Sequence, residues 1–489
     1  MNLKTGIEGL TPWRIVFAVS MLSLCAVLPA WFNYDIIARD GAFQYIPAAR
    51  LFMDRGFMAF SAVSQLPLFP MFLALVSGLT GLDLEMSGRL ISALSFIVAS
   101  LGIYMAAWTI FKDRWVALLS VLFLISNHEL LTRSVDCLKE SLLIMLVVWG
   151  NYFILRGIDQ GFHRGLLFLL GIIVLFFGAI VRTTALFFLG AWVILWAFHK
   201  SKGMPLRVIV LSMPVIALGG LMILMPDLGL FHRKGFALIA LFSGWPGLSA
   251  MSKAGLDTIV EFFATGNCLI MLFGFIGFFI HKKDLYYIHV CLVFLMYLLV
   301  LSMMGWTSDR YLLAPVMWFY PMAAYAVIRS LRSIKRPVRV LAILAIVSCP
   351  FMWAYMALTP PDADKLARRQ AGEWILSRVG PGARIMTNRD RLAFYARGLY
   401  TPLADDMDKT DAMDKTDDMD KTDVMDNAGR QDKKALSYCM ALDTLHEDGR
   451  DMKREMDNAG RQPDKTFRTI HVYLPMSGLP IPETPEQGF

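Results

Sequence analysis

Long apolar runs recur along most of this chain, and they constrain its fold more than any other feature. Runs of about 18 residues or more are long enough to cross a bilayer as α-helices. Of the 489 residues, 56% are hydrophobic and 18% are charged, whereas about a quarter of the residues in a soluble domain are charged. The sequence therefore predicts an all-α polytopic membrane bundle and excludes a soluble enzyme of this size.

About eleven transmembrane helices are predicted. The first run, 15–32, is too long for a signal peptide and lacks a small-residue cleavage pattern, so we expect it to be retained. The segment 66–79 is only about 14 residues long, which favours an interfacial or re-entrant piece. The predicted spans are 15–32, 90–111, 115–131, 138–155, 165–181, 184–198, 207–225, 264–280, 285–304, 311–328 and 338–357.

The basic residues of the short turns predict the orientation. If the N-terminus is cytoplasmic and 66–79 does not cross, every short basic turn falls on the cytoplasmic side, as the positive-inside rule requires. These turns contain Lys112, Arg114, Arg156, Arg164, Lys200, Lys202, Arg207, Lys282, Lys283, Arg329, Arg332, Lys335, Arg336 and Arg339. The net charge of +7 is thus largely an orientation signal and not evidence for nucleic-acid binding.

Four parts are predicted along the chain. They are a transmembrane domain at 1–358 with a long outside loop at 34–87, a small α/β unit at 359–403, a low-complexity segment at 404–466, and a C-terminal strand and tail at 467–489. Helical spacing over 362–379 is followed by a strand pattern at 383–386. The low-complexity segment repeats Met-Asp-Lys-Thr-Asp from Met407, Met413 and Met419 and is too polar to fold, so we expect it to be disordered.

The outside turns carry the candidate functional residues, because ionisable groups at a membrane boundary are functional candidates by default. The long outside loop begins with Asp35 and Asp40. A carboxylate at this position could act as a general base towards an acceptor hydroxyl or amine. From composition, a second interpretation stays open, in which both are solvated charges that pair with Arg39. Other outside turns carry His128, Asp136, Lys139, Glu140, Arg182 and Arg310.

The stretch from Arg39 to Gly56 resembles the first luminal loop of bacterial GT-C glycosyltransferases, which are integral-membrane enzymes that use polyprenyl-phosphate sugars. These include the protein O-mannosyltransferase-like enzymes (glycosyltransferase family 39-like) and the lipid A aminoarabinose transferases. Members have an Asp, then a Tyr and an Ala-rich helix that ends in Gly, here Asp40, Tyr45 and Gly56. Further segments are similar to the family in the same order, namely Gln65–Pro70, Ser87–Ser92, Ser134–Glu140, Asp309–Pro315 and Trp374–Tyr395.

The chain also departs from the family pattern. Gly41 stands where an acidic residue often follows the first Asp, and Leu66 stands where a His is common. A Glu often found near the Arg-Thr turn is absent after Arg182. These differences leave metal dependence and substrate class open.

The resemblance implies a transferase at the periplasmic face of a bacterial inner membrane. The donor would be a polyprenyl-phosphate-linked sugar, the acceptor a lipid, glycan or protein, and the reaction an inverting displacement at the anomeric carbon. Asp40 is the expected base and Asp35 the second candidate, with Tyr45 expected to bind substrate. Arg310 either holds the donor phosphate through paired hydrogen bonds or extends its charge to the interface.

Roles for the remaining candidates stay open. Lys139 and Arg182 are secondary phosphate ligands. Asp136 and Glu140 are four residues apart, which predicts one helical face; they either bind the acceptor or a divalent cation, or pair with neighbouring basic residues. His128 either lines the site or has a capping or packing role. No cofactor follows with certainty.

A polytopic transporter, or a flippase or polymerase of lipid-linked glycans, is the alternative. A transporter would have polar or Gly/Pro-broken spans near the bilayer midplane and an internal repeat of the bundle. Few charges lie within the spans and no such repeat is visible, whereas the polar candidates gather at one interface. This pattern favours an interfacial transferase.

Overall fold

The computed structural model describes residues 11–33, 36–56, 66–159, 164–199, 248–280, 285–304, 309–332, 336–358, 362–381, 384–387, 390–397, 399–401, 438–443, 453–454, 463–467 and 470–473. The chain forms two compact units. The first, which we call the helical unit, comprises 1–34 and 40–359. The second, the α/β unit, comprises 35–39 and 360–489.

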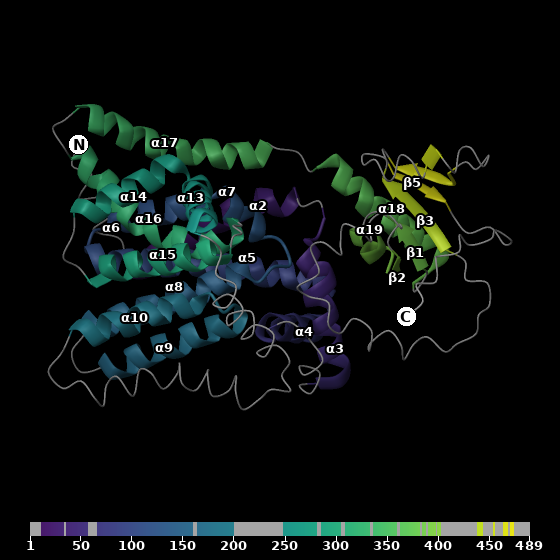
Figure 1. Cartoon of the computed structure of the whole chain (residues 1–489), viewed down its shortest axis with the longest axis horizontal. Helices are drawn as coiled ribbons and strands as arrows, with labels where there is room; N and C mark the ends of the chain where they lie inside the picture. Colours follow the sequence, from purple (N-terminus) through teal and green to yellow (C-terminus); the bar gives the residue numbers. More distant parts are fainter. Residues whose placement is uncertain are drawn as a thin grey trace. The chain divides into compact units, whose positions relative to one another are not determined.

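The helical unit is a bundle of α-helices with one short π-helix, η1 (Figure 1). In chain order its described elements are α2 (Pro12–Phe32), η1 (Gly41–Tyr45), α3 (Ile46–Arg55), α4 (Leu68–Thr80), α5 (Leu84–Phe111), α6 (Arg114–Ile125), α7 (His128–Arg133), α8 (Glu140–Asp159), α9 (Arg164–Val181), α10 (Ala185–His199), α13 (Leu248–Thr265), α14 (Cys268–Ile280), α15 (Leu285–Met304), α16 (Asp309–Leu331) and α17 (Arg336–Leu358).

The predicted polytopic bundle with a C-terminal α/β unit is confirmed, and the chain is a multi-pass membrane protein. Among the described residues, six helices are long and apolar enough to cross a membrane, or seven if the bent pair α13–α14 forms one span. Four further apolar helices, α4, α6, α9 and α10, are shorter. Every predicted span except 207–225 overlaps one or two described helices, and 207–225 lies outside the described residues. The segment 66–79, predicted not to cross, forms the 13-residue helix α4.

The prediction of one continuous span at 115–131 is wrong, because the chain breaks between α6 and α7. Asn127 caps α7, where its side-chain oxygen accepts a hydrogen bond from the backbone N–H of Leu130 at 2.7 Å. Its amide nitrogen donates to the carbonyl of Thr265 at 2.6 Å and to the hydroxyl of Tyr320 at 2.8 Å. One buried amide therefore caps α7 and joins its start to α13 and α16.

The predicted span 264–280 also contains a break. Helices α13 and α14 meet at 104°, and Asn267 at the junction has a φ of 65°. Asparagine is among the few residues other than glycine that adopt this left-handed conformation readily. Only 268–280 continues as α14, and an unpredicted helix, α13, precedes it.

Helix α16 is deeply buried in the bundle. Of an 18-residue apolar stretch of this helix, 83% is buried. Close packing against α14 requires a glycine, because a Cβ atom at Gly277 would lie 2.5 Å from the carbonyl oxygen of Met322. Arg310 lies in the first turn of α16. Beyond its last turn, Arg332 forms an ion pair with Asp113 at 2.9 Å. The packing of α16 thus fixes the position of Arg310 at one end of the bundle.

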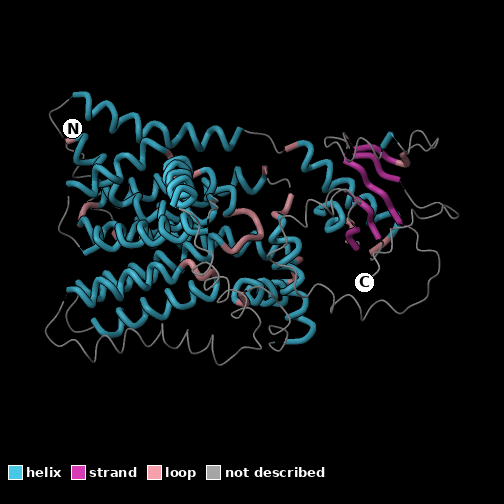
Figure 2. Tube along the Cα trace, viewed as in Figure 1, coloured by secondary structure: helices cyan, strands magenta, loops and turns pink. Residues whose placement is uncertain are grey.

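The α/β unit contains a mixed five-stranded sheet in the order β2-β1-β3-β5-β4. Its strands are magenta in Figure 2. β1 pairs in parallel with β2 and β3, and β5 pairs antiparallel with β3 and β4. Its elements are α18 (Ala363–Val379), β1 (Arg384–Thr387), α19 (Asp390–Tyr395), β2 (Leu399–Thr401), β3 (Tyr438–Asp443), β4 (Lys465–Phe467) and β5 (Ile470–Tyr473). The helix and strand predicted at 362–379 and 383–386 match α18 and β1.

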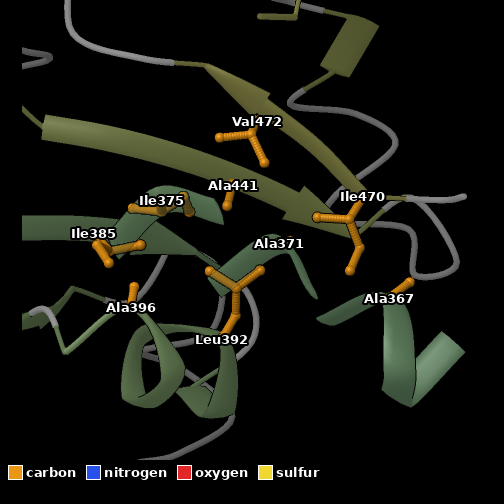
Figure 3. Packing of buried hydrophobic residues seen from close by; sticks show 9 residues of the cluster. All are labelled: Ala367, Ala371, Ile375, Ile385, Leu392, Ala396, Ala441, Ile470 and Val472. Atoms are coloured by element: carbon orange, nitrogen blue, oxygen red, sulfur yellow. The ribbon is translucent and has the colours of Figure 1, made fainter. Parts of the chain in front are cut away.

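Small apolar side chains from both helices and three strands form the core of this unit (Figure 3). The cluster comprises Ala367, Ala371, Ile375, Ile385, Leu392, Ala396, Ala441, Ile470 and Val472. Strand β3 corrects the prediction of disorder over 404–466, because its Ala441 is fully buried. The repeats from Met407 to Asp423 lie outside the described residues.

Candidate functional site

Asp40 and Arg310 form an ion pair although they are 270 residues apart in the sequence. Nη1 of Arg310 donates to Oδ2 of Asp40 at 2.5 Å. Asp40 directly precedes η1, and Arg310 lies in the first turn of α16. Both side chains remain partly exposed, at 23% and 30%. The pair is therefore accessible to a molecule that approaches this end of the bundle.

A second, buried ion pair lies beside the first. Nη1 of Arg182, in the turn between α9 and α10, lies 3.3 Å from Oε1 of Glu140, the first residue of α8. The same nitrogen donates to the backbone carbonyl of Arg310 at 3.3 Å, and the guanidinium lies 4.0 Å from the ring centroid of Tyr311. Arg182 therefore connects the start of α8 to the start of α16.

Tyr45 lies at the centre of this group of charges. Its side chain is 1% exposed and packs edge-on against Phe69, with ring centroids 5.2 Å apart. Nζ of Lys139 lies 5.3 Å from its ring centroid. Burial raises the pKa of the Tyr45 hydroxyl well above its usual range, and the nearby Glu140 and Asp40 raise it further. Tyr45 therefore stays neutral and can act as a hydrogen-bonding group but not as a base.

Three cationic side chains thus face two carboxylates at one end of the bundle. Arg310, Arg182 and Lys139 carry the positive charges, and Asp40 and Glu140 carry the negative ones. Oε2 of Glu140 is buried and has no hydrogen-bond partner among the described residues. It provides an acceptor for a donor group of a bound molecule.

A further cluster, which sequence reasoning missed, consists of Glu129, Arg133 and Asp309. Nη2 of Arg133 donates to Oδ2 of Asp309 and lies 3.4 Å from Oε2 of Glu129. A side-chain hydrogen bond also joins Glu129 to Asp309. The four-residue spacing of Glu129 and Arg133 could have predicted the ion pair between these two residues. No local pattern links α7 to Asp309, which precedes Arg310.

Glu129 is expected to make stability depend on pH. Burial, followed by the hydrogen bond to Asp309, raises the pKa of Glu129 from 4.5 to about 7. The folded protein therefore binds more protons than the unfolded chain between these values, and stability falls as pH rises through this window. The unfolding temperature of the wild type should drop between about pH 5.5 and about pH 8, and the drop should be smaller in Glu129→Gln.

The matched control is Glu261→Gln on α13, which removes another partly exposed carboxylate of the helical unit. Thermal unfolding in detergent at both pH values measures the effect. An equal drop in the wild type and in Glu129→Gln would contradict the assignment.

Three further candidates are Asp35, Asp136 and His128. Asp35 lies outside the described residues. The predicted shared helical face of Asp136 and Glu140 is wrong, because Asp136 precedes α8 and accepts a hydrogen bond from the backbone N–H of Cys137 at 2.7 Å. His128 begins α7 and contacts Tyr355 edge-on at 5.9 Å, as a packing role predicts. Burial lowers the pKa of His128, so its ring is neutral at pH 7.

The described residues contain no group of three or more His, Cys, Asp or Glu side chains placed to hold a metal ion. Arg182 occupies one oxygen of Glu140, the carboxylate proposed to share a divalent cation with Asp136. These residues therefore do not fit the predicted cation site. Metal dependence stays a prediction of the sequence alone.

Comparison with known proteins identifies the fold. No protein-family model and no curated protein matches the sequence. The structure of ArnT from Cupriavidus metallidurans in the apo state matches with a TM-score of 0.64 and 11% identity, over 94% of this chain and 97% of that chain. The same protein bound to undecaprenyl phosphate matches with a TM-score of 0.64 and 11% identity, over 97% of this chain and 100% of that chain.

A third match is the oligosaccharyltransferase of Archaeoglobus fulgidus in complex with Zn and sulfate. Its TM-score is 0.49 at 12% identity, over 79% of this chain and 62% of that chain. The chain matches the two ArnT structures over nearly its whole length. The chain therefore has the fold of ArnT.

Proposed function

We propose that this protein transfers a sugar from a polyprenyl-phosphate donor to an acceptor hydroxyl or amine at the outside face of the membrane. The observation that carries the proposal is the Asp40–Arg310 pair, which places a carboxylate beside a cluster of cations at one end of the bundle. The GT-C fold and the undecaprenyl phosphate bound to ArnT support a lipid-phosphate donor.

The charge of the site matches such a donor. A polyprenyl-phosphate sugar is a phosphodiester with one negative charge, and the site holds the cationic side chains of Arg310, Arg182 and Lys139. When the sugar leaves, the phosphate becomes a monoester that carries close to two negative charges at neutral pH. Cations already held in place stabilise this developing charge without reorganisation. Arg310, Arg182 and Lys139 are the groups that supply it.

The transfer is a direct displacement at the anomeric carbon. Asp40 accepts the proton of the acceptor group as the acceptor oxygen or nitrogen bonds to the anomeric carbon. The bond from that carbon to the phosphate oxygen breaks, and polyprenyl phosphate leaves with the electron pair. Arg310 has five N–H donors, so it can contact the phosphate and Asp40 together. Attack opposite the leaving group inverts the anomeric configuration.

The distribution of charge supports the outside face. Asp40, Glu140 and Arg182 gather with Arg310 at the first turn of α16. The basic turn residue Arg332 lies beyond the other end of α16. Since basic turns mark the cytoplasmic side, the site belongs to the opposite face. In a bacterium, that face of the inner membrane is the periplasmic one.

A reconstitution assay tests the proposed function. Wild-type protein in liposomes is supplied with a panel of polyprenyl-phosphate sugars and with an envelope extract that contains lipids, glycans and proteins. We expect release of polyprenyl phosphate that requires both one particular donor and the extract. Movement of the intact donor across the bilayer without cleavage would instead indicate a flippase and would contradict the proposal.

Loss of Arg310 is expected to weaken binding of the lipid product. A hydrogen bond to a charged group contributes about 1.5–3 kcal/mol, so Arg310→Gln should bind undecaprenyl phosphate about 10- to 150-fold more weakly than the wild type. Thermal-shift titration of the purified protein with undecaprenyl phosphate measures the affinity. Arg332→Gln, at the other end of α16, is the matched control and should bind normally. Equal affinities for the Arg310 variant and the wild type would exclude this phosphate contact.

A further inference from the structure

The first turn of α16 carries Arg310, and the helix itself holds this turn less firmly than the turns that follow. The first four N–H groups of an α-helix have no partner within the helix. Pro315 has no N–H, so the helical hydrogen bond to the carbonyl of Tyr311 is missing as well. The backbone around Arg310 therefore depends on contacts with other parts of the helical unit.

Side chains hold the backbone of Arg310 on both sides. Its N–H donates to Oδ1 of Asp309 at 2.7 Å, and its carbonyl accepts a hydrogen bond from Nη1 of Arg182 at 3.3 Å. The other oxygen of Asp309, Oδ2, accepts a hydrogen bond from Nη2 of Arg133, which lies in the last turn of α7. A chain of hydrogen bonds therefore runs from Arg133 through Asp309 to the backbone of Arg310.

Arg133 is well placed to hold Asp309. The two side chains form an ion pair and are only 19% and 26% exposed, so water screens their attraction less than at the surface. Nη2 of Arg133 also lies 3.4 Å from Oε2 of Glu129, one turn earlier on α7. The start of α7 is itself held by Asn127, which donates to α13 and α16. Helix α7 is thus a fixed support for the start of α16.

We infer that Arg133 is a positioning residue for Arg310. Through Asp309 it fixes the first turn of α16, and with it the direction in which the Arg310 guanidinium extends toward Asp40 and the donor phosphate. The inference rests on the proposed function, in which Arg310 binds phosphate. Arg133 acts through Arg310 and needs no contact with the substrate.

The first test is Arg133→Gln, with the affinity for undecaprenyl phosphate measured by thermal-shift titration of the purified full-length protein. We expect binding about 2- to 12-fold weaker than in the wild type, which corresponds to one hydrogen bond of about 0.5–1.5 kcal/mol. Arg133→Lys keeps a cation beside Asp309 and should recover most of the affinity. The matched control is Arg55→Gln, which removes an exposed arginine at the end of α3 and should bind normally.

A double variant separates positioning from a direct effect of the Arg133 charge. Residues that act through one another do not show additive losses. Arg133→Gln combined with Arg310→Gln should therefore bind undecaprenyl phosphate no more weakly than Arg310→Gln alone. Additive losses would overturn the inference, because Arg133 would then act on the phosphate without Arg310.

A second variant keeps the test decisive if Arg133→Gln does not fold. Asp309→Asn keeps an acceptor for the Arg310 N–H but loses the carboxylate that pairs with Arg133, so its affinity should fall by a similar factor. Wild-type affinity in Arg133→Gln or in Asp309→Asn would also overturn the inference. An affinity that does not respond to Arg310→Gln would count against the proposed function itself, so the two failures are distinguishable.

Discussion

Asp40→Asn is expected to abolish most sugar transfer while leaving the fold and donor binding intact. A positioned general base contributes about 100- to 10,000-fold to the rate, so kcat should fall by about that factor. Asparagine has nearly the same shape and can still accept a hydrogen bond from Arg310, but it cannot take up the acceptor proton. The substitution also removes a negative charge beside Arg310. Undecaprenyl phosphate should therefore bind at least as tightly as to the wild type.

The measurement compares initial rates of transfer with the affinity for undecaprenyl phosphate in the same preparation. Asp54→Asn is the matched control, because Asp54 is an exposed carboxylate of α3 in the same outside loop. We expect its transfer rate to equal that of the wild type. Full activity of a normally folded Asp40→Asn would remove Asp40 from the mechanism, and comparable losses in both variants would mean that the loop needs its net charge and not a base.

The second large effect concerns the buried pair of Arg182 and Glu140. Their side chains are only 8% and 2% exposed. Removing one partner of a buried ion pair costs about 3–5 kcal/mol, because the other charge is left without compensation. Arg182→Met should therefore unfold at a markedly lower temperature than the wild type. The double variant Arg182→Met, Glu140→Leu contains no unpaired charge at this position and should recover much of the loss.

An exposed pair provides the control for this experiment. Arg332 and Asp113 lie 2.9 Å apart, but the Arg332 side chain is 58% exposed. Exposed pairs contribute about 0–1 kcal/mol, so Arg332→Met should change the unfolding temperature little. Thermal unfolding in nanodiscs measures all three variants. If the double variant were as unstable as Arg182→Met alone, the cost would come from lost packing and not from the unpaired carboxylate.

Hydropathy predicts where the membrane helices lie better than it predicts where they break. The apolar run 115–131 contains the polar residues 126–129 near its end, but the apolar residues around them keep the window average high. The break depends on hydrogen bonds from Asn127 to Thr265 and Tyr320, which are distant in the sequence. The bend at Asn267 is of the same kind, because a single backbone conformation produces it.

The face on which the candidate residues lie could be predicted, but not every pairing among them. Charge asymmetry between the turns assigns Asp40 and Arg310 to the same side of the membrane. Their ion pair requires α16 to begin beside η1, which only the packing of the bundle decides. The same limit explains why Glu129 and Asp309 were not linked, since they lie on different outside turns. Asp136 was misplaced because α8 starts four residues later than its spacing suggested.

The prediction of disorder over 404–466 was wrong at β3, because it rested on local composition. The six residues of β3 follow a long polar repeat segment, and the low hydrophobicity of that segment favoured disorder over 404–466. In the structure, Ala441 packs against Ile470 and Val472, and this tertiary contact supplies the apolar burial that the sequence window lacks. The returning strand was predicted correctly, because β5 carries an alternating apolar pattern of its own.

The repeats lie in the sequence between two strands of the sheet, and this position has a genetic consequence. Residues 402–437 connect β2 to β3, and both strands flank β1 in fixed parallel register. Slippage during DNA replication adds or removes repeats in units of six codons, the spacing of Met407, Met413 and Met419. The entropic cost of closing a connection grows only with the logarithm of its length, so one extra unit costs about 0.1 kcal/mol. Alleles with different repeat numbers should therefore encode the same sheet.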